Sequence, residues 1–263
     1  MLRKTTYLLL LAVTVLTACK TPTNIAYFQD VKENTPIQVS GDGYIRFQPG
    51  DKLNILVHSR DEKLMELFNV TGRNNTVNMN ANNGQNYAPY TIDAKGEIDF
   101  PVLGTVKVEG LTRDEVAKLI KEQLVSNNLC KDAVVTVAFY NMTFSVLGTV
   151  GSAGTLPINK DRITLLEAIA MANDLQIDGL RKNVLVMRQE GDKRVPYRVD
   201  LTSAESIYCS PVYYIQQNDL VYVEPNNKHK RSSTVMGSSA YQPTFWMSLA
   251  SFLTTMALIF VKL

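Results

Sequence analysis

The sequence predicts an α+β protein with two domains in its body and a helix at its C-terminus. Segments with the apolar alternation of strands are interspersed with two segments that have helical apolar spacing and a capping box. The chain has 263 residues, which is long enough for two modest domains behind a leader segment. Near its end, residues 245–261 contain no charged side chain, which indicates a membrane helix.

Residues 1–18 have the three parts of a secretion signal peptide. Two basic residues near the start precede an apolar stretch at 7–16, and the letters LTAC follow at 16–19. The apolar stretch is too short to span a bilayer, so it does not enter the fold. The letters LTAC resemble the bacterial lipobox, in which cleavage before the cysteine exposes it for lipid attachment. We expect lipidation at Cys19 and a lipidated tether at 19–43, although an ordinary signal peptide with a chance cysteine is the simpler alternative.

Charge is balanced overall but unevenly placed. The chain has 27 basic and 25 acidic residues, and two of the basic ones lie in the signal peptide. A neutral mature chain has no electrostatic footprint for nucleic acid, so we expect no nucleic-acid partner. No acidic residue follows Glu224, whereas Lys228, Lys230 and Arg231 are basic. Residues 226–243 are therefore predicted to be a basic juxtamembrane linker.

The first body domain is predicted at residues 44–141. It opens with a strand that buries Leu53, Ile55 and Val57 on one face, and a short helix follows at 61–68. Residues 69–89 carry eight asparagines without an apolar period, which is typical of a surface loop.

The domain continues with three short strands and a bend at Leu103-Gly104. The capping box of Thr112 and Glu115 then starts a helix, whose apolar stripe comprises Val116, Leu119, Ile120 and Leu124. Residues 132–140 have the composition of a fully buried strand.

The second body domain is predicted at residues 142–225. Strand-like residues 144–158 precede a second capping box, formed by Thr164 and Glu167, which starts a helix. The letters VLVMRQ and RVPYRVDL then read as a hairpin, and residues 213–225 close the domain. The letters LGTV occur in both domains, at 103–106 and 147–150, each with a glycine four residues later, which suggests two related strand–turn–helix units.

A transmembrane helix is predicted at residues 244–262. Its uncharged part would be roughly 25 Å long, slightly short of a typical hydrocarbon core. Three interpretations compete: a lone anchor, a surface-lying amphipathic helix, and one stave of a helical barrel. A surface helix would need charges on its polar face, and this one has only hydroxyls. These hydroxyls share one side of the helix and are our candidates for pore lining or helix packing: Thr244, Ser248, Ser251, Thr254 and Thr255.

Catalytic chemistry is not indicated by the sequence. The folded body has one histidine, His58, and neither metal-ligand spacing nor a phosphate-binding glycine loop. Asp51 and Asp219 lie beside turns, where capping of the turn is the expected role. Cys130 and Cys209 remain after lipidation and form a possible disulfide, with two separate buried thiols as the alternative. We therefore expect no enzyme, no metal and no cofactor.

Taken in order, these landmarks resemble the outer-membrane polysaccharide export lipoproteins that serve capsule and exopolysaccharide secretion. The resemblance covers about residues 44–225. Its first part resembles a polysaccharide export domain and its second a soluble-ligand-binding β-grasp (SLBB) domain. The residues that carry it are Tyr44-Ile45, Pro49-Gly50-Asp51, Gly96-Glu97-Ile98, Pro101, Leu103-Gly104, Gly110-Leu111-Thr112 and Glu115, and then Val146-Leu147-Gly148, Gly154, Leu165-Leu166-Glu167-Ala168-Ile169 and Asn218-Asp219-Leu220-Val221.

The resemblance implies a homo-oligomeric ring, an octamer in the best-known members, that exports polysaccharide through an outer-membrane pore of C-terminal helices. It also implies a periplasmic body and an inner-membrane polysaccharide co-polymerase with a tyrosine kinase as partner. Two features depart from the family: only one β-grasp domain is recognisable, and the asparagine-rich stretch is not part of the motif. The alternative hypothesis is a monomeric lipoprotein that binds soluble glycan through its β-grasp domain, and an envelope hydrolase is a third.

Overall fold

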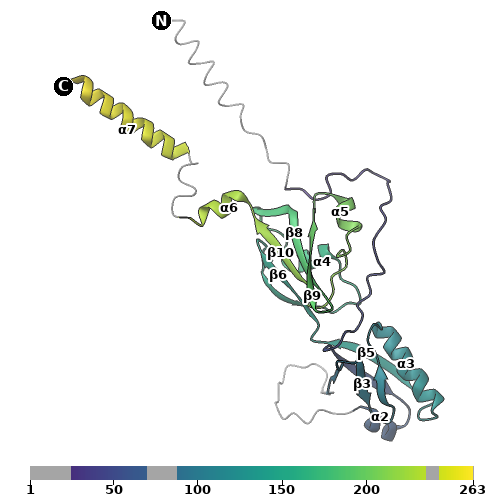
Figure 1. The fold of residues 1–263 in the computed structure, drawn as a ribbon. Helices are drawn as coiled ribbons and strands as arrows, with labels where there is room; N and C mark the ends of the chain where they lie inside the picture. Colours follow the sequence, from purple (N-terminus) through teal and green to yellow (C-terminus); the bar gives the residue numbers. More distant parts are fainter. Residues whose placement is uncertain (1–24, 70–87, 235–242, 263) are drawn as a thin grey trace.

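The computed structural model describes residues 25–69, 88–234 and 243–262, and Figure 1 shows their arrangement. The body contains two consecutive units of mixed α and β structure. The predicted signal peptide, Cys19 and most of the asparagine-rich stretch lie outside the described residues.

The first unit is built on a three-stranded antiparallel sheet. Its central strand is β1 (Lys52–His58), with β2 (Tyr90–Thr91) on one side and β5 (Val134–Tyr140) on the other. The predicted buried face of β1 is confirmed, since Leu53, Ile55 and Val57 are at most 2% exposed. A separate hairpin joins β3 (Glu97–Phe100) to β4 (Gly104–Lys107).

Two helices complete this unit, and both begin as predicted. Asp61 caps α2 (Glu62–Phe68) by accepting a hydrogen bond from the Lys63 amide. The capping box of Thr112 and Glu115 is formed at the start of α3 (Arg113–Ser126). The apolar stripe of α3 packs against β5 and buries Val116, Ile120 and Leu124 completely.

The prediction that the strand within 132–140 is fully buried is wrong. In β5 only Val137 is buried, whereas Val134 is 58% exposed. The physical reason is that one face of this small sheet is open to solvent, so Val134, Thr136 and Ala138, which alternate along β5, are exposed. An apolar run alone does not show whether one or both faces of a strand are covered.

The asparagine-rich stretch starts with an ordered residue. The Asn69 side chain accepts a hydrogen bond from the Val57 amide and donates one to the Val57 carbonyl, both at 2.8 Å. It therefore satisfies backbone groups of β1 that would otherwise need a strand partner. The predicted surface loop begins at Asn69, and its residues 70–87 lie outside the described part.

The second unit is a five-stranded mixed sheet in the order β7-β6-β10-β8-β9. Strands β6 and β10 are parallel, and every other pairing is antiparallel. The capping box of Thr164 and Glu167 is formed at the start of α4, and the predicted hairpin is β8-β9. The short helix α5 was not predicted. The bounds are β6 (Thr143–Gly148), β7 (Gly154–Pro157), α4 (Leu165–Met171), β8 (Gly179–Glu190), β9 (Lys193–Val199), α5 (Ala204–Tyr208) and β10 (Leu220–Pro225).

Residues 25–43 form a strap along the second unit instead of a free tether. The amides of Gln29 and Ser40 donate to the carbonyls of Thr202 and Tyr208, at 2.7 and 2.9 Å. Asp30 accepts hydrogen bonds from the Ser203 hydroxyl and the Ala204 amide at the start of α5. In Figure 1 the strap is the purple segment that descends along this unit toward the first one. The described part of the predicted tether is thus held in place.

The C-terminal region contains α6 (Asn227–Ser232) and α7 (Pro243–Lys262). Helix α6 lies in the predicted basic linker, and α7 nearly coincides with the predicted span. However, none of the helices in the described ranges is long and apolar enough to cross a membrane, so the predicted transmembrane helix is not supported. Helix α7 is about 30 Å long at 1.5 Å per residue, and hydroxyl residues interrupt its apolar sequence.

Candidate functional site

The predicted hydroxyl stripe lies on α7, and the hydroxyls of Ser248, Thr254 and Thr255 bond to carbonyls of that helix. Ser248 donates to the Phe245 carbonyl at 2.8 Å, and Thr255 donates to the Ser251 carbonyl at 2.7 Å. Thr254 donates to two carbonyls of the preceding turn. Because these protons are satisfied internally, the stripe can face another helix without leaving an unpaired donor.

Apolar side chains on α7 are uncovered in the described chain. Trp246 and Phe252 are each about 60% exposed, and Met247 is 67% exposed. An exposed set of large apolar residues of this kind marks a site that meets a membrane or another protein. The exposed apolar residues of α7 are therefore typical of a helix that contacts a membrane or another protein.

The two cysteines of the body are free thiols. Cys130 is buried in the first unit, where its Sγ lies 3.6 Å from Asp132 Oδ1. Cys209 is exposed at the end of α5, with its Sγ 3.6 Å from the Gln38 carbonyl of the strap. The predicted possible disulfide is therefore not formed in this structure. Of the two alternatives the separate thiols are found, although only Cys130 is buried.

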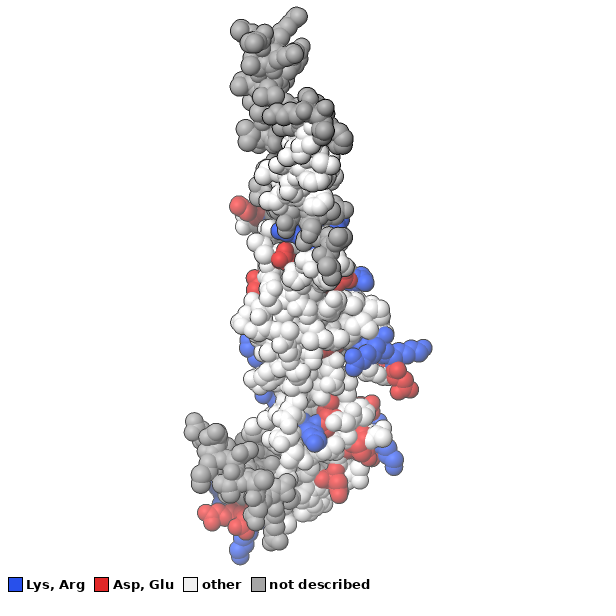
Figure 2. Space-filling model, turned by 90° about the vertical axis from the view of Figure 1, so that its left-hand side faces the viewer, with Lys and Arg blue, Asp and Glu red and all other residues white. Residues whose placement is uncertain are grey.

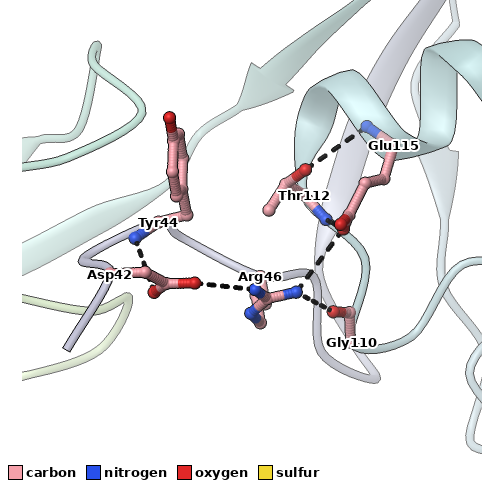
Figure 3. A network of polar contacts seen from close by, with 6 residues as sticks. All are labelled: Asp42, Tyr44, Arg46, Gly110, Thr112 and Glu115. Atoms are coloured by element: carbon pink, nitrogen blue, oxygen red, sulfur yellow. Dashed lines mark hydrogen bonds and ion pairs between the residues drawn. The ribbon is translucent and has the colours of Figure 1, made fainter.

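A polar network fixes the strap where it enters the first unit, as Figure 3 shows. Arg46 pairs with Asp42 at 2.8 Å and with Glu115 at 3.4 Å, and it donates to the Gly110 carbonyl at 3.0 Å. Hydrogen bonds from Arg46 lower the pKa of Asp42, and the Thr112 amide lowers the pKa of Glu115. All three charged side chains are about half exposed, so these ion pairs contribute little to the free energy of folding. Their main effect is to orient the strap against the first unit.

The same region joins the two units through a second set of contacts. Arg113, the first residue of α3, pairs with Asp161 at 2.8 Å, and the Asp161 carbonyl accepts a hydrogen bond from the Ile45 amide at 3.0 Å. The Arg162 guanidinium stacks over the Tyr44 ring at 3.7 Å. Beneath these polar contacts the hydrophobic core is continuous between the units. We call this region, residues 42–46 with Arg113, Asp161 and Arg162, the junction.

Gly43 has no room for a side chain at the junction. Its φ is +73°, and a Cβ there would lie 2.5 Å from the Tyr214 ring. Gly41 has a similar φ of +77°, but the nearest atom to its Cβ position is 3.9 Å away. At Gly43 the strap lies directly against the Tyr214 ring of the second unit, so only glycine fits at this position.

We predict that Gly43→Ala lowers the free energy of unfolding by about 1–3 kcal/mol, through backbone strain and overpacking against Tyr214. The measurement is the midpoint of urea unfolding of the detergent-solubilised chain. Gly41→Ala is the matched control, because it introduces the strain without the clash. Equal midpoints for the two variants would contradict the Tyr214 contact.

A buried ion pair holds the loop that carries Tyr214. Arg188 binds Asp219 through two hydrogen bonds of 3.2 and 2.6 Å, and both side chains are nearly inaccessible. Arg188 also donates to the carbonyls of Pro211 and Tyr214, at 3.0 and 2.6 Å. Asp219 accepts a further hydrogen bond from the Gln216 amide, so its predicted role as a turn cap is confirmed.

Asp51 is likewise a turn cap, as predicted, and it is also buried. Its carboxylate accepts a hydrogen bond from the Gln48 amide at 2.9 Å. Burial raises the pKa of Asp51 to about 6, and the hydrogen bonds from Gln48 and Gln217 oppose this rise. The other residue considered for chemistry, His58, is exposed at the end of β1.

Beside the junction lies a hollow of about 210 Å³. Its lining is mainly polar and includes Asp42, Tyr44, Arg46, Gln48, Gln216 and Gln217. Amides, a carboxylate and an aromatic ring can bind a hydroxylated solute, but they do not form a nucleophile with an adjacent base. Figure 2 shows acidic and basic side chains interspersed on the face in view. The lining of the hollow is therefore suited to weak binding of a hydroxylated solute.

Sequence reasoning missed the charged residues of the junction and the buried ion pair. Arg46 reaches Glu115 and Arg113 reaches Asp161, which are distant in the sequence, and no spacing rule indicates such pairs. Arg188 did carry a signal, because it follows Val184 and Val186 on the buried face of β8. A charged residue at such a position requires a buried partner.

Each of the two units matches a known protein family. Residues 39–139 match a family model described as polysaccharide biosynthesis/export protein, and residues 142–223 match the SLBB domain. The two matched segments meet at the start of β6, where the first unit ends and the second begins.

A curated relative is the EPS I polysaccharide export outer membrane protein EpsA of Ralstonia solanacearum. It is 27% identical to this chain over 191 residues, which cover 70% of the chain and 49% of the relative. The chain thus spans about half the length of the curated relative it matches. The matched export family and this relative are transport proteins, not enzymes.

Proposed function

Because the chain belongs to the polysaccharide export family, with an export domain followed by an SLBB domain, we propose that it exports capsular or exopolysaccharide across the outer membrane. The observation that carries this proposal is the pairing of the two domains across the junction. The fixed geometry of Arg46, Arg113 and Gly43 gives every copy the same shape, as repeated assembly requires.

The working unit of the proposal is a homo-oligomeric ring whose body lies in the periplasm. Subunit number follows from the family resemblance, which implies an octamer. Specificity for polymer then depends on the width and lining of the passage more than on a binding pocket. The inner-membrane partner, by the same resemblance, is a polysaccharide co-polymerase with a tyrosine kinase.

Membrane attachment has two parts in this proposal. A lipid on Cys19 holds the N-terminal end, and the relative's outer-membrane assignment supports the same location here. In this proposal several copies of α7 together form the pore. In such a bundle the hydroxyl stripe faces the passage or a neighbouring helix, and the apolar residues face outward.

Deleting the gene tests the export proposal directly. We expect polysaccharide to disappear from the cell surface and to accumulate inside the envelope, because synthesis continues while export stops. Restoring the intact chain is expected to restore surface polymer. An unchanged amount of surface polysaccharide in the deletion strain would contradict the proposed function.

We predict that replacing Ser251 and Thr255 together with leucine reduces polysaccharide export strongly and leaves folding unchanged. The Thr255 hydroxyl bonds to the Ser251 carbonyl within α7, and both side chains are exposed on that helix, so the body domains are unaffected. The measurement is surface polymer per cell at equal protein level. Phe252→Leu on another face of α7 is the control, and normal export by the double variant would refute the stripe's role.

A second candidate function is glycan binding by a monomeric lipoprotein. The specific observation that favours it is the polar hollow beside the junction, which combines Tyr44 with side-chain amides. Arg46→Ala would weaken such binding, since Arg46 lines the hollow. The two functions differ in the size of the native particle, which is one subunit for the binding protein and several for the ring.

A further inference from the structure

A rigid loop at residues 174–178 presents an apolar side chain to solvent. Ile177 is 73% exposed, more than any other large apolar residue in the described part of the chain. The loop is held from beneath by buried Arg181, which donates to the carbonyls of Gln176 and Gly179 at 2.8 Å and to that of Leu175 at 3.3 Å. A loop fixed in this way keeps Ile177 outside the core.

The basic helix α6 is attached to this loop. The Asn226 amide donates to the Asp178 carbonyl at 2.7 Å, and its side chain donates to the Asp178 carboxylate at 2.8 Å. His229 lies 3.7 Å from the same carboxylate. Lys230 pairs with Glu224, the last acidic residue of the chain. Helix α6 therefore places basic residues next to the loop, and two of them, His229 and Lys230, face the acidic side chains of Asp178 and Glu224.

The strap also starts at this loop. The Tyr27 hydroxyl donates to Asp174, which fixes the strap eight residues after Cys19. Eight extended residues span at most about 29 Å, so a lipid on Cys19 would be confined to the neighbourhood of the loop. Figure 1 places α6 and the start of the strap at the end of the SLBB domain that is farther from the export domain.

We propose that the loop 174–178 and α6 form a docking surface for anionic phospholipid headgroups, with Ile177 entering the interfacial layer. An exposed apolar side chain flanked by basic residues is the combination that binds an anionic membrane surface. Both membrane-directed ends of the chain leave from this surface, which fits a bilayer better than a protein partner. The assignment goes beyond polymer transport and requires only that the protein is attached to a membrane.

Tryptophan fluorescence tests this assignment in the full-length protein, because Trp246 is the single native tryptophan. Ile177→Trp in a Trp246→Phe background is reconstituted into vesicles of phosphatidylethanolamine and phosphatidylglycerol. We expect blue-shifted emission that brominated phospholipid quenches, and loss of both effects in phosphatidylcholine vesicles. Leu67→Trp in the same background is the control, because Leu67 is 50% exposed on α2 of the export domain.

A charge variant tests the contribution of the basic helix with the same tryptophan as reporter. Adding Lys228→Glu is expected to reduce the quenching, whereas Lys118→Glu on α3 leaves it unchanged. Water-exposed emission from Ile177→Trp in anionic vesicles would overturn the assignment. Blue-shifted emission that brominated lipid does not quench would also overturn it, since the loop would then contact a second copy of the chain. No polysaccharide is present, so the result is separate from the export proposal.

Discussion

Replacing Asp219 with alanine is expected to lower the free energy of unfolding of the SLBB domain by about 3–5 kcal/mol. The substitution leaves the Arg188 guanidinium buried without its counter-charge, and breaking a buried pair from one side costs this amount. It also removes the acceptor for the Gln216 amide. The loop that carries Tyr214 keeps its hydrogen bonds from Arg188 but loses the one to Asp219, so we expect the junction to loosen as well.

The measurement is the urea midpoint of the detergent-solubilised chain, followed by circular dichroism. Lys118→Ala is the control, because Lys118 and Glu122 form an exposed pair at 3.9 Å whose loss costs little. Replacing Arg188 and Asp219 together with leucine is expected to cost less than Asp219→Ala alone, since no unpaired charge remains. A midpoint for Asp219→Ala equal to that of the wild type would show that the pair does not stabilise the fold.

The second large effect is expected from Gly148→Ala, at about 2–5 kcal/mol. Gly148 ends β6 with a φ of +94°, and a Cβ there would lie 2.1 Å from the Val223 carbonyl oxygen of β10. That oxygen belongs to the backbone of the paired strand, so it cannot move aside as a side chain would. The substitution combines left-handed strain with a clash in the parallel β6–β10 pair.

Two other glycines separate these contributions. Gly104→Ala introduces the strain alone, because Gly104 has a φ of +75° and nothing within 4 Å of its Cβ position. Gly154→Ala introduces neither, since its Cβ position is open and its φ is ordinary. We expect stability to fall in the order Gly154→Ala, Gly104→Ala, Gly148→Ala in the same urea experiment. Equal effects at Gly104 and Gly148 would contradict the clash.

Local signals in the sequence predicted much of the fold. Both capping boxes are formed where the Thr-x-x-Glu spacing places them, because each depends only on residues within one turn. The alternation of Leu53, Ile55 and Val57 likewise predicts their common buried face. The hairpin at Glu190–Lys193 follows from its turn residues.

Features that depend on the assembled sheet were not predictable in this way. The letters LGTV suggested a repeated unit, but Gly104 starts β4 whereas Gly148 ends β6, so the two copies occupy different places in their sheets. The sequence does not predict the strap, because its hydrogen bonds to the second unit join residues 147 or more positions apart. The pairs of Arg46 with Glu115 and of Arg188 with Asp219 depend on the same long-range packing.

The native mass of the particle tests the export ring most directly. The protein is extracted from outer membranes in mild detergent, and its mass is measured by light scattering after correction for bound detergent. The account predicts one particle with several copies of the chain, and the same mass for the Ser251 and Thr255 leucine variant if only the passage is altered. A particle containing a single copy, in cells that still display the polysaccharide, would contradict it.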